Sequence, residues 1–100
     1  MSVYVDPLMQ HGWKLRGHVV KSCHLYADTL DELHTMAERI GLKRKWFQEH
    51  PFLPHYDLTA VRRLAALRAG AKEASRHEMV AVLRARRLSI RRGQPQYPEP

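Results

Sequence analysis

The sequence has one cysteine, no long apolar run and no signal-peptide pattern, and each absence excludes a class of protein. A single thiol, Cys23, cannot form an intrachain disulfide or a cysteine-based zinc knuckle. No apolar run approaches the roughly 18 residues of a membrane-spanning helix, and residues 1–6 lack the charged and apolar regions of a signal peptide. We therefore expect a cytoplasmic protein without a membrane segment, built as one domain.

Acidic residues are scarce in one part of the chain. Residues 1–61 hold seven Lys or Arg and seven Asp or Glu, whereas residues 62–92 hold ten Lys or Arg and only two Glu. Such a basic half suggests an anionic partner, most often a nucleic acid, although an arginine-rich solvated helix face would look the same. The nucleic-acid contacts predicted in this part are Arg63, Arg84, Arg86, Arg87, Arg91 and Arg92.

Strands and helices alternate along the predicted domain. Strands are predicted at residues 3–6, 18–27, 55–58 and 71–74, and helices at residues 30–40, 60–69 and 76–88. Residues 7–17 are expected to be irregular because Pro7, Gly12 and Gly17 interrupt them. The elements predict an α/β fold, a small two-layer sandwich with a mixed sheet of three or four strands and three helices, in the order β-β-α-β-α-β-α.

The predicted helices have clear starts. Their N-caps are Thr29, Thr59 and Ser75. The second helix is expected to face inward with Val61, Leu64 and Ala65.

The globular domain is predicted to span residues 1–88. Residues 89–100 should form a basic, proline-rich disordered tail, since they lack apolar periodicity.

Alternation along the strands separates apolar from polar side chains. Residues such as Val5, Cys23, Leu25 and Leu58 share one face of the predicted sheet. The side chains expected on the opposite face are Tyr4, Asp6, His24, Tyr26, Asp28, His55 and Asp57. Because ligands of open α/β sheets collect beyond the carboxyl ends of strands, these histidines and aspartates predict a polar site at one edge.

Two chemistries fit such a site. The candidate catalytic residues, as acid–base groups, are His24, Asp28, His55 and Asp57. The candidate ligands of a divalent metal, the one cofactor that the sequence indicates, are Asp6, His24 and Asp57. The alternative is structural: Asp28 and Asp57 precede helices, where aspartate is a favoured cap, and Asp6 precedes Pro7 in a common turn pair.

The loop after the first helix interleaves cations with aromatics. Lys43, Arg44 and Lys45 precede Trp46 and Phe47. Exposed aromatics can stack on bases while cations hold phosphates, so the first four of these residues are predicted nucleic-acid contacts. At least one of the two aromatic side chains is expected to anchor the loop to the core instead.

Two other residues are assigned structural roles. His34 lies beside the apolar stripe of the first helix and is expected to pack there, half-buried. Cys23 falls on the apolar face of its strand and is expected to be an inert core thiol.

Several short motifs occur together in this chain. They are Tyr4-Val5-Asp6, Cys23-His24-Leu25-x-Ala27-Asp28-Thr29, Glu32-Leu33-His34, Arg44-Lys45-Trp46-x-Gln48 and His55-Tyr56-Asp57-Leu58. Over about residues 2–74 the chain resembles a small family of unknown function whose members are short bacterial and phage proteins. The resemblance implies a role near nucleic acid or in conflict between phage and host. It also implies that one set of residues belongs together: His24, Asp28, His34, Trp46, His55, Tyr56 and Asp57.

Three functions stay open on the sequence. The first is a nucleic-acid- or nucleotide-binding module with a His/Asp site at the sheet edge. The second is a small metal-dependent hydrolase of the phosphodiesterase or nuclease type, because paired histidines and aspartates can hold a metal. The third is a protein-interaction factor. The sequence does not determine the oligomeric state.

Overall fold

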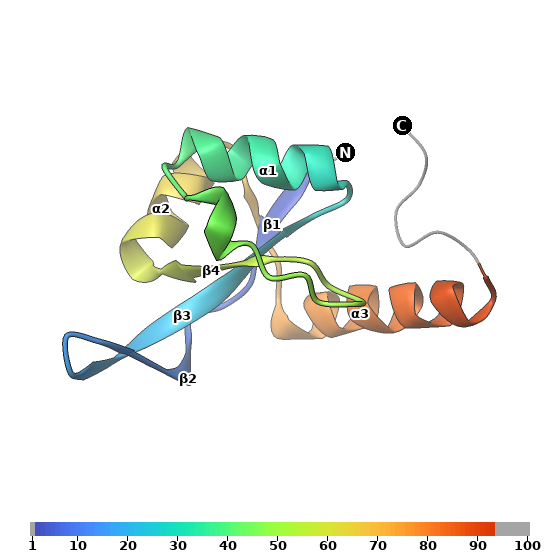
Figure 1. Cartoon of the computed structure of the whole chain (residues 1–100), viewed down its shortest axis with the longest axis horizontal. Helices are drawn as coiled ribbons and strands as arrows, with labels where there is room; N and C mark the ends of the chain where they lie inside the picture. Colours follow the sequence, from blue (N-terminus) through green and yellow to red (C-terminus); the bar gives the residue numbers. More distant parts are fainter. Residues whose placement is uncertain (1, 94–100) are drawn as a thin grey trace.

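The computed structural model of the protein describes residues 2–93 (Figure 1). Its elements are β1 (Val3–Val5), β2 (Met9–Leu15), β3 (His18–Ala27), α1 (Leu30–Arg39), the 3-10 helix η1 (Arg44–Trp46), β4 (Tyr56–Thr59), α2 (Ala60–Arg68), β5 (Lys72–Glu73) and α3 (Arg76–Arg91). The predicted α/β class is confirmed, with a mixed five-stranded sheet and three α-helices in this part of the chain. Among the described residues, no helix combines the length and apolarity needed to cross a membrane.

The additional strand is β2, which lies where irregular chain was predicted. Most of its residues are exposed, and His11 and Gly12 interrupt the alternation of its apolar side chains, so the strand pattern in the sequence is weak. Its conformation comes from pairing with β3, from Met9 opposite Ser22 to Leu15 opposite His18. Together they form a long hairpin that projects from the body of the molecule (Figure 1).

Strand β3 is the centre of the sheet. Leu25 pairs with Val5 of β1 and with Tyr56 of β4, and Ser22 likewise pairs with β2 and β4. Strand β4 therefore lies on one side of β3, while β1 and β2 follow one another along its other side. Strands β1 and β4 both run antiparallel to β3, and β5 adds to β1 in parallel.

An extra residue lies between β1 and β2, where their shared pairing with β3 is interrupted. From Val5 to Met9 the chain advances four positions, whereas the partners on β3 advance only three, from Leu25 to Ser22. The inserted residue has the effect of a β-bulge, which bends a strand and changes the direction of a side chain. Asp6 lies in this interruption.

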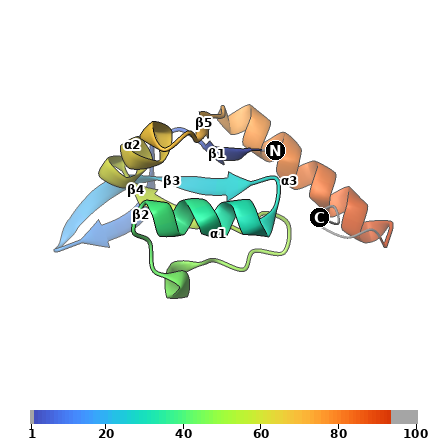
Figure 2. The ribbon, with the colours of Figure 1, turned by 90° about the horizontal axis from the view of Figure 1, so that it is seen from above.

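The two faces of the sheet are covered differently. Helices α1 and α2 cover the predicted apolar face, where Val5, Cys23, Leu25 and Leu58 are fully buried in the main core. On the other face, a smaller cluster forms around Tyr26, against which the first half of α3 packs. From there α3 runs away from the sheet at the end opposite the β2–β3 hairpin (Figures 1 and 2).

The helix predictions are largely confirmed, with two corrections. The side chains of Thr29, Thr59 and Ser75 cap the three helices as expected. The predicted inward face of α2 is confirmed for Ala65, which packs against the core beside the buried Ala66. It is wrong for Val61, which is 78% exposed, and for Leu64, which is 48% exposed. Helix α3 continues to Arg91, beyond the predicted end, and the rest of the predicted tail, 94–100, lies outside the described residues.

Candidate functional site

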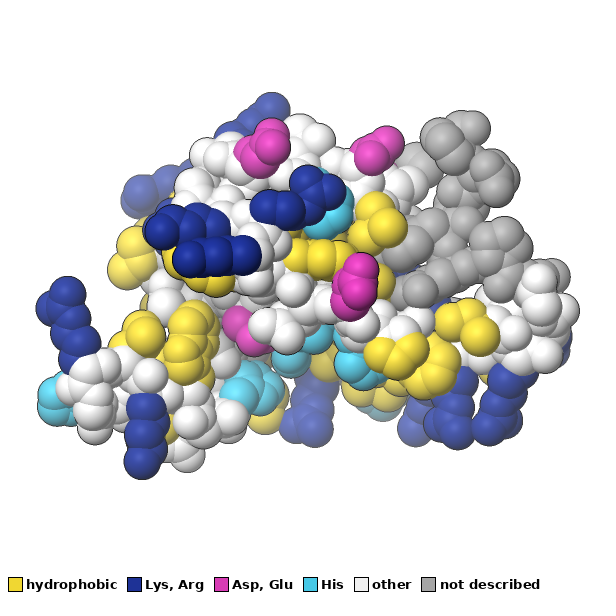
Figure 3. All heavy atoms as spheres, in the orientation of Figure 1, with side chains coloured by type: hydrophobic (Ala, Val, Ile, Leu, Met, Phe, Trp, Pro, Cys, Tyr) yellow, Lys and Arg dark blue, Asp and Glu magenta, His cyan; other side chains and the backbone are white. Residues whose placement is uncertain are grey.

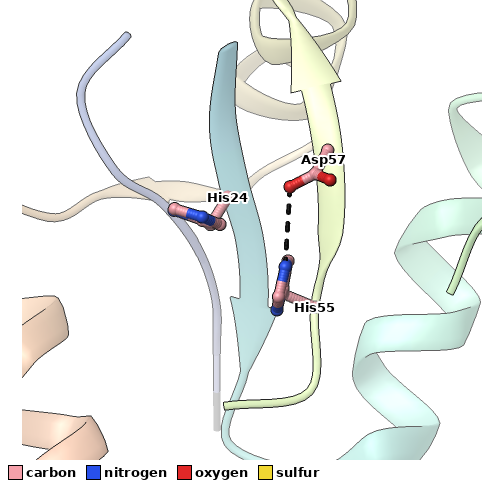
Figure 4. A group of neighbouring side chains, drawn as sticks. All are labelled: His24, His55 and Asp57. Atoms are coloured by element: carbon pink, nitrogen blue, oxygen red, sulfur yellow. Dashed lines mark ion pairs between the residues drawn. The ribbon is translucent and has the colours of Figure 1, made fainter. Parts of the chain in front are cut away.

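Four of the predicted site residues converge on the face opposite α1. His24 of β3 lies directly across from Asp57 of β4, and His55 immediately precedes β4. Figure 4 shows these three side chains on two neighbouring strands. Asp6 reaches His24 from the other side of β3, out of the interruption between β1 and β2. The convergence therefore depends on pairing across three segments that are distant in sequence.

Asp6 holds His24 by two hydrogen bonds. The backbone N–H of His24 donates to Asp6 Oδ1 at 2.6 Å, and the ring Nδ1–H donates to Oδ2 at 2.8 Å. The carboxylate is buried, with 4% of the residue exposed. Its hydrogen bond, reinforced by its charge and that of Asp57, raises the pKa of His24 above the usual value, although burial opposes this. Asp6 thus stands behind the histidine and sets its orientation.

His55 is oriented by a backbone carbonyl. Its ring Nδ1 lies 2.7 Å from the carbonyl oxygen of Leu53, which can only accept, so Nδ1 carries the proton. The other ring nitrogen, Nε2, is 3.5 Å from Asp57 Oδ1. A hydrogen bond donated by Nε2 of the protonated form of His55 lowers the pKa of Asp57, and the charges of nearby histidines act in the same direction against the effect of burial.

His24, His55 and Asp57 could together hold a metal ion. One ligand atom from each lies within 4.8 Å of the others. The two histidines are partly buried and Asp57 is exposed, so the group opens toward solvent on the carboxylate side. Two imidazoles and a carboxylate are a common donor set for divalent transition metals, and they can equally act as general acids and bases.

A cleft of about 710 Å³ lies beside this group. Its walls come from the β2–β3 hairpin, the segment around η1, and the β4–α2 junction, and Figure 3 shows the hollow between the hairpin and the main body. His24 and Asp57 line it together with His11, Trp13, Lys45, Trp46 and Arg62. The His/Asp group and the aromatic-basic loop, which are separate in the sequence, therefore border the same space.

Asp28 lies elsewhere. Strand β3 runs antiparallel to β1 and β4, so its carboxyl end is at the opposite end of the sheet from theirs. There, Asp28 Oδ2 accepts hydrogen bonds from the backbone N–H of Ser2 at 2.7 Å and from the Tyr4 hydroxyl at 3.3 Å. The N-caps of α1 and α2 are Thr29 and Thr59, so Asp28 and Asp57 do not cap these helices.

A family model matches most of the chain. The family described as "Protein of unknown function (DUF4031)" covers residues 3–86. The chain belongs to this family. The match confirms the resemblance drawn from the short motifs and extends it over most of α3, which those motifs do not include. No match is found among curated proteins or among solved structures.

The predicted basic contacts of this DUF4031 chain have different environments. Arg63 Nε donates to the Asp6 carbonyl and Arg86 to the Ala27 carbonyl, so both side chains are tied to the sheet. Four more of the predicted arginines are exposed on or just after α3: Arg84, Arg87, Arg91 and Arg92. Figure 3 shows Lys and Arg side chains gathered both near η1 and along the underside of α3. The exposed cations among the predicted contacts thus form two groups, one near the cleft and one on α3.

The loop aromatics divide as predicted. Phe47 packs against His34 and Tyr56, whereas Trp46 is 42% exposed, borders the cleft and lies under Lys43 Nζ at 5.6 Å. His34 Nδ1 shares a hydrogen bond of 2.9 Å with the Tyr56 hydroxyl on the α1 side of the sheet. The expected packing role of His34 is therefore confirmed.

Sequence reasoning missed several residues of the cleft, among them three that could contact a ligand by charge, ring stacking or hydrogen bonding: His11, Trp13 and Arg62. His11 lies with its ring centre 5.2 Å from that of His24. Both His11 and Trp13 sit where the β2–β3 pairing shifts register, and only the hairpin brings them near β4. For Arg62 a signal existed, since it opens the basic half of the chain just after the His-Tyr-Asp motif.

Proposed function

We propose that the protein binds a nucleotide or a single-stranded nucleic acid in its cleft. The observation that carries this proposal is the lining of the cleft, where two tryptophans and two cations border one hollow: Trp13, Trp46, Lys45 and Arg62. Proteins that bind single strands combine a positively charged groove with aromatic side chains on which bases stack. The cleft offers both kinds of contact within one volume.

Each contact has a specific role in this proposal. The exposed ring of Trp46 stacks on a base, while Lys45 and Arg62 attract the phosphates. Arg62 Nη1 donates to the carbonyl of Ile40, which fixes the guanidinium at the edge of the cleft. A guanidinium has five N–H donors, so this one bond leaves others for a phosphate. The arginines of α3 supply longer-range attraction from the other end of the molecule.

Fluorescence anisotropy of a labelled 12-mer of deoxythymidine tests the proposal. We expect binding at 50 mM NaCl that weakens about twentyfold at 200 mM, as contacts to about three phosphates of a single strand predict. At 50 mM NaCl, Lys45→Ala should weaken binding relative to the native chain. The control Lys72→Ala, which replaces an exposed lysine of β5 that does not line the cleft, should leave the affinity unchanged. Absence of binding at 50 mM NaCl, or equal affinities for the two variants, would contradict the proposal.

Metal-dependent phosphodiester hydrolysis is the second candidate function. It is favoured by one observation, that His24 and Asp57 stand in the wall of the same cleft. A metal held there would activate water for attack on a phosphorus atom. Incubation of the labelled 12-mer with the protein and Mn²⁺ should then give shorter products, and Asp57→Asn should abolish them. Intact oligonucleotide after prolonged incubation would exclude this candidate and leave the binding proposal standing.

A further inference from the structure

The two histidines of the candidate site each have one ring nitrogen already engaged. In His24, Nδ1–H donates to the Asp6 carboxylate, and in His55 it donates to the carbonyl of Leu53. A neutral imidazole with its proton on Nδ1 has a lone pair on Nε2. Histidines that bind metals almost always have the non-ligating nitrogen held by a carboxylate or a backbone carbonyl in this way.

Asp57 completes a set of three donors. Its carboxylate is already 3.5 Å from His55 Nε2, close to the roughly 3.3 Å that separates two ligand atoms on a tetrahedral zinc ion. All three ligand atoms lie within 4.8 Å of one another, so binding requires a contraction of at most roughly 1.5 Å. The side chain of Asp57 is 44% exposed, which allows it to make that movement.

We infer that His24, His55 and Asp57 form a binding site for a divalent transition-metal ion such as Zn²⁺. Two imidazole donors favour Zn²⁺ and its neighbours over Mg²⁺ and Ca²⁺, which prefer oxygen ligands. Three protein ligands leave coordination positions for water or substrate. Because His24 and Asp57 line the cleft, these open positions face the cleft. The site stands independently of nucleic-acid binding, but the second candidate function requires it.

Asp6 is the positioning residue of this site. Both of its oxygens bind His24, and the residue is almost fully buried, so it fixes the ring without reaching the ion. Loss of such an outer partner typically weakens metal binding about 10- to 100-fold. We expect this effect from Asp6→Asn, and a larger one from replacing a ligand.

Isothermal titration calorimetry with Zn²⁺ alone, without nucleic acid, tests the inference. The native chain should bind one equivalent, and His24→Gln, His55→Gln and Asp57→Asn should each weaken binding by more than Asp6→Asn does. Matched controls are His77→Gln and Asp31→Asn, whose side chains are exposed on α3 and α1. The controls should leave the affinity unchanged, and excess Mg²⁺ should not displace Zn²⁺.

Either of two results would overturn the site. One is the absence of Zn²⁺ binding at micromolar concentrations, and the other is equal affinity in the native chain and in Asp57→Asn. Because Asp57 is exposed, this variant tests ligation without disturbing the core, and melting curves in EDTA confirm that all variants fold. Anisotropy with the deoxythymidine 12-mer, run in EDTA, separately reports nucleic-acid binding.

Discussion

The two faces of β3 differ in what their side chains do, although they belong to the same ten residues. Cys23 and Leu25 point toward α1 and α2 and are fully buried. His24, between them, points to the other face, beside Asp57 and the cleft. One strand thus supplies both the core and the candidate site, at alternate positions. Substitution of Leu25 should therefore change the stability of the fold, whereas substitution of its neighbour His24 should change ligand binding.

The largest expected effect concerns the thiol on the buried face. Burial, together with the nearby charge of Asp6, raises the pKa of Cys23 to about 12. At pH 8 its thiolate fraction should be about a thousandfold below that of an unfolded cysteine. Alkylation by iodoacetamide should therefore be slower by at least that factor in the native chain than in urea. Equal rates would show that the buried face is open to solvent.

Truncation of a side chain should cost more stability on the buried face of β3 than at the exposed end of the strand. Leu25→Ala should lower the free energy of unfolding by about 2–5 kcal/mol, because it removes methyl groups from a fully buried position. Val19→Ala, on the 46% exposed part of β3, should change it by about 0.5 kcal/mol or less. Urea denaturation measures both values. Similar losses in the two variants would contradict the assignment of the core.

Two neighbouring aromatics of the loop extend the comparison to ligand binding. Trp46→Ala should weaken binding of the deoxythymidine 12-mer about tenfold, the loss of one stacked base, with little effect on stability. Phe47→Ala should lower stability, because its ring packs on His34 and Tyr56, and should leave affinity nearly unchanged once folded. Anisotropy measures the affinity of both variants for the 12-mer, and urea denaturation measures their stability. The reversed pattern would place Trp46 in the core and Phe47 in the cleft.

The smallest expected effect is the opposite dependence of stability on pH at two histidines, His24 and His34. The hydrogen bond to Asp6 raises the pKa of His24 above 6.5, whereas burial and the charge of Arg44 lower that of His34. His24 should thus add stability that is full below pH 6.5 and lost as pH rises through its folded pKa. His34, neutral in its packed position, should add stability above pH 6.5 that is lost as pH falls. NMR titration in EDTA should place the His24 midpoint above that of His34; the opposite order would contradict both assignments.

Alternation and capping residues made much of the fold predictable. The division of β3 between Leu25 and His24 follows from a period of two, and the helix starts follow from Thr29 and Ser75. Strand β2 could not be predicted, because its polar side chains face solvent and only its partner on β3 makes it a strand. The exposure of Val61 could not be predicted either, because an apolar residue at helical spacing is expected to face the core.

For the candidate site, sequence predicted the members better than their arrangement. His24, His55 and Asp57 were correctly expected on one face, but the grouping of Asp28 with them required all strand ends to meet at one edge. The antiparallel direction of β3 takes Asp28 to the other end. His11 was missed for the opposite reason, since nothing in the local sequence indicates that the hairpin carries it next to His24.

The double pairing of β3 also determines where the protein should open. Amide protons between Ser22 and Leu25 belong to the segment with partners on both sides, so they should exchange with deuterated water among the slowest in the chain. The hairpin tip near Gly17 has neighbours on one side only and should exchange early. Local opening of the cleft would therefore move the β2–β3 hairpin, with Trp13, while His24 stays in place. A bound molecule could enter and leave without any disturbance of the histidine that it meets inside.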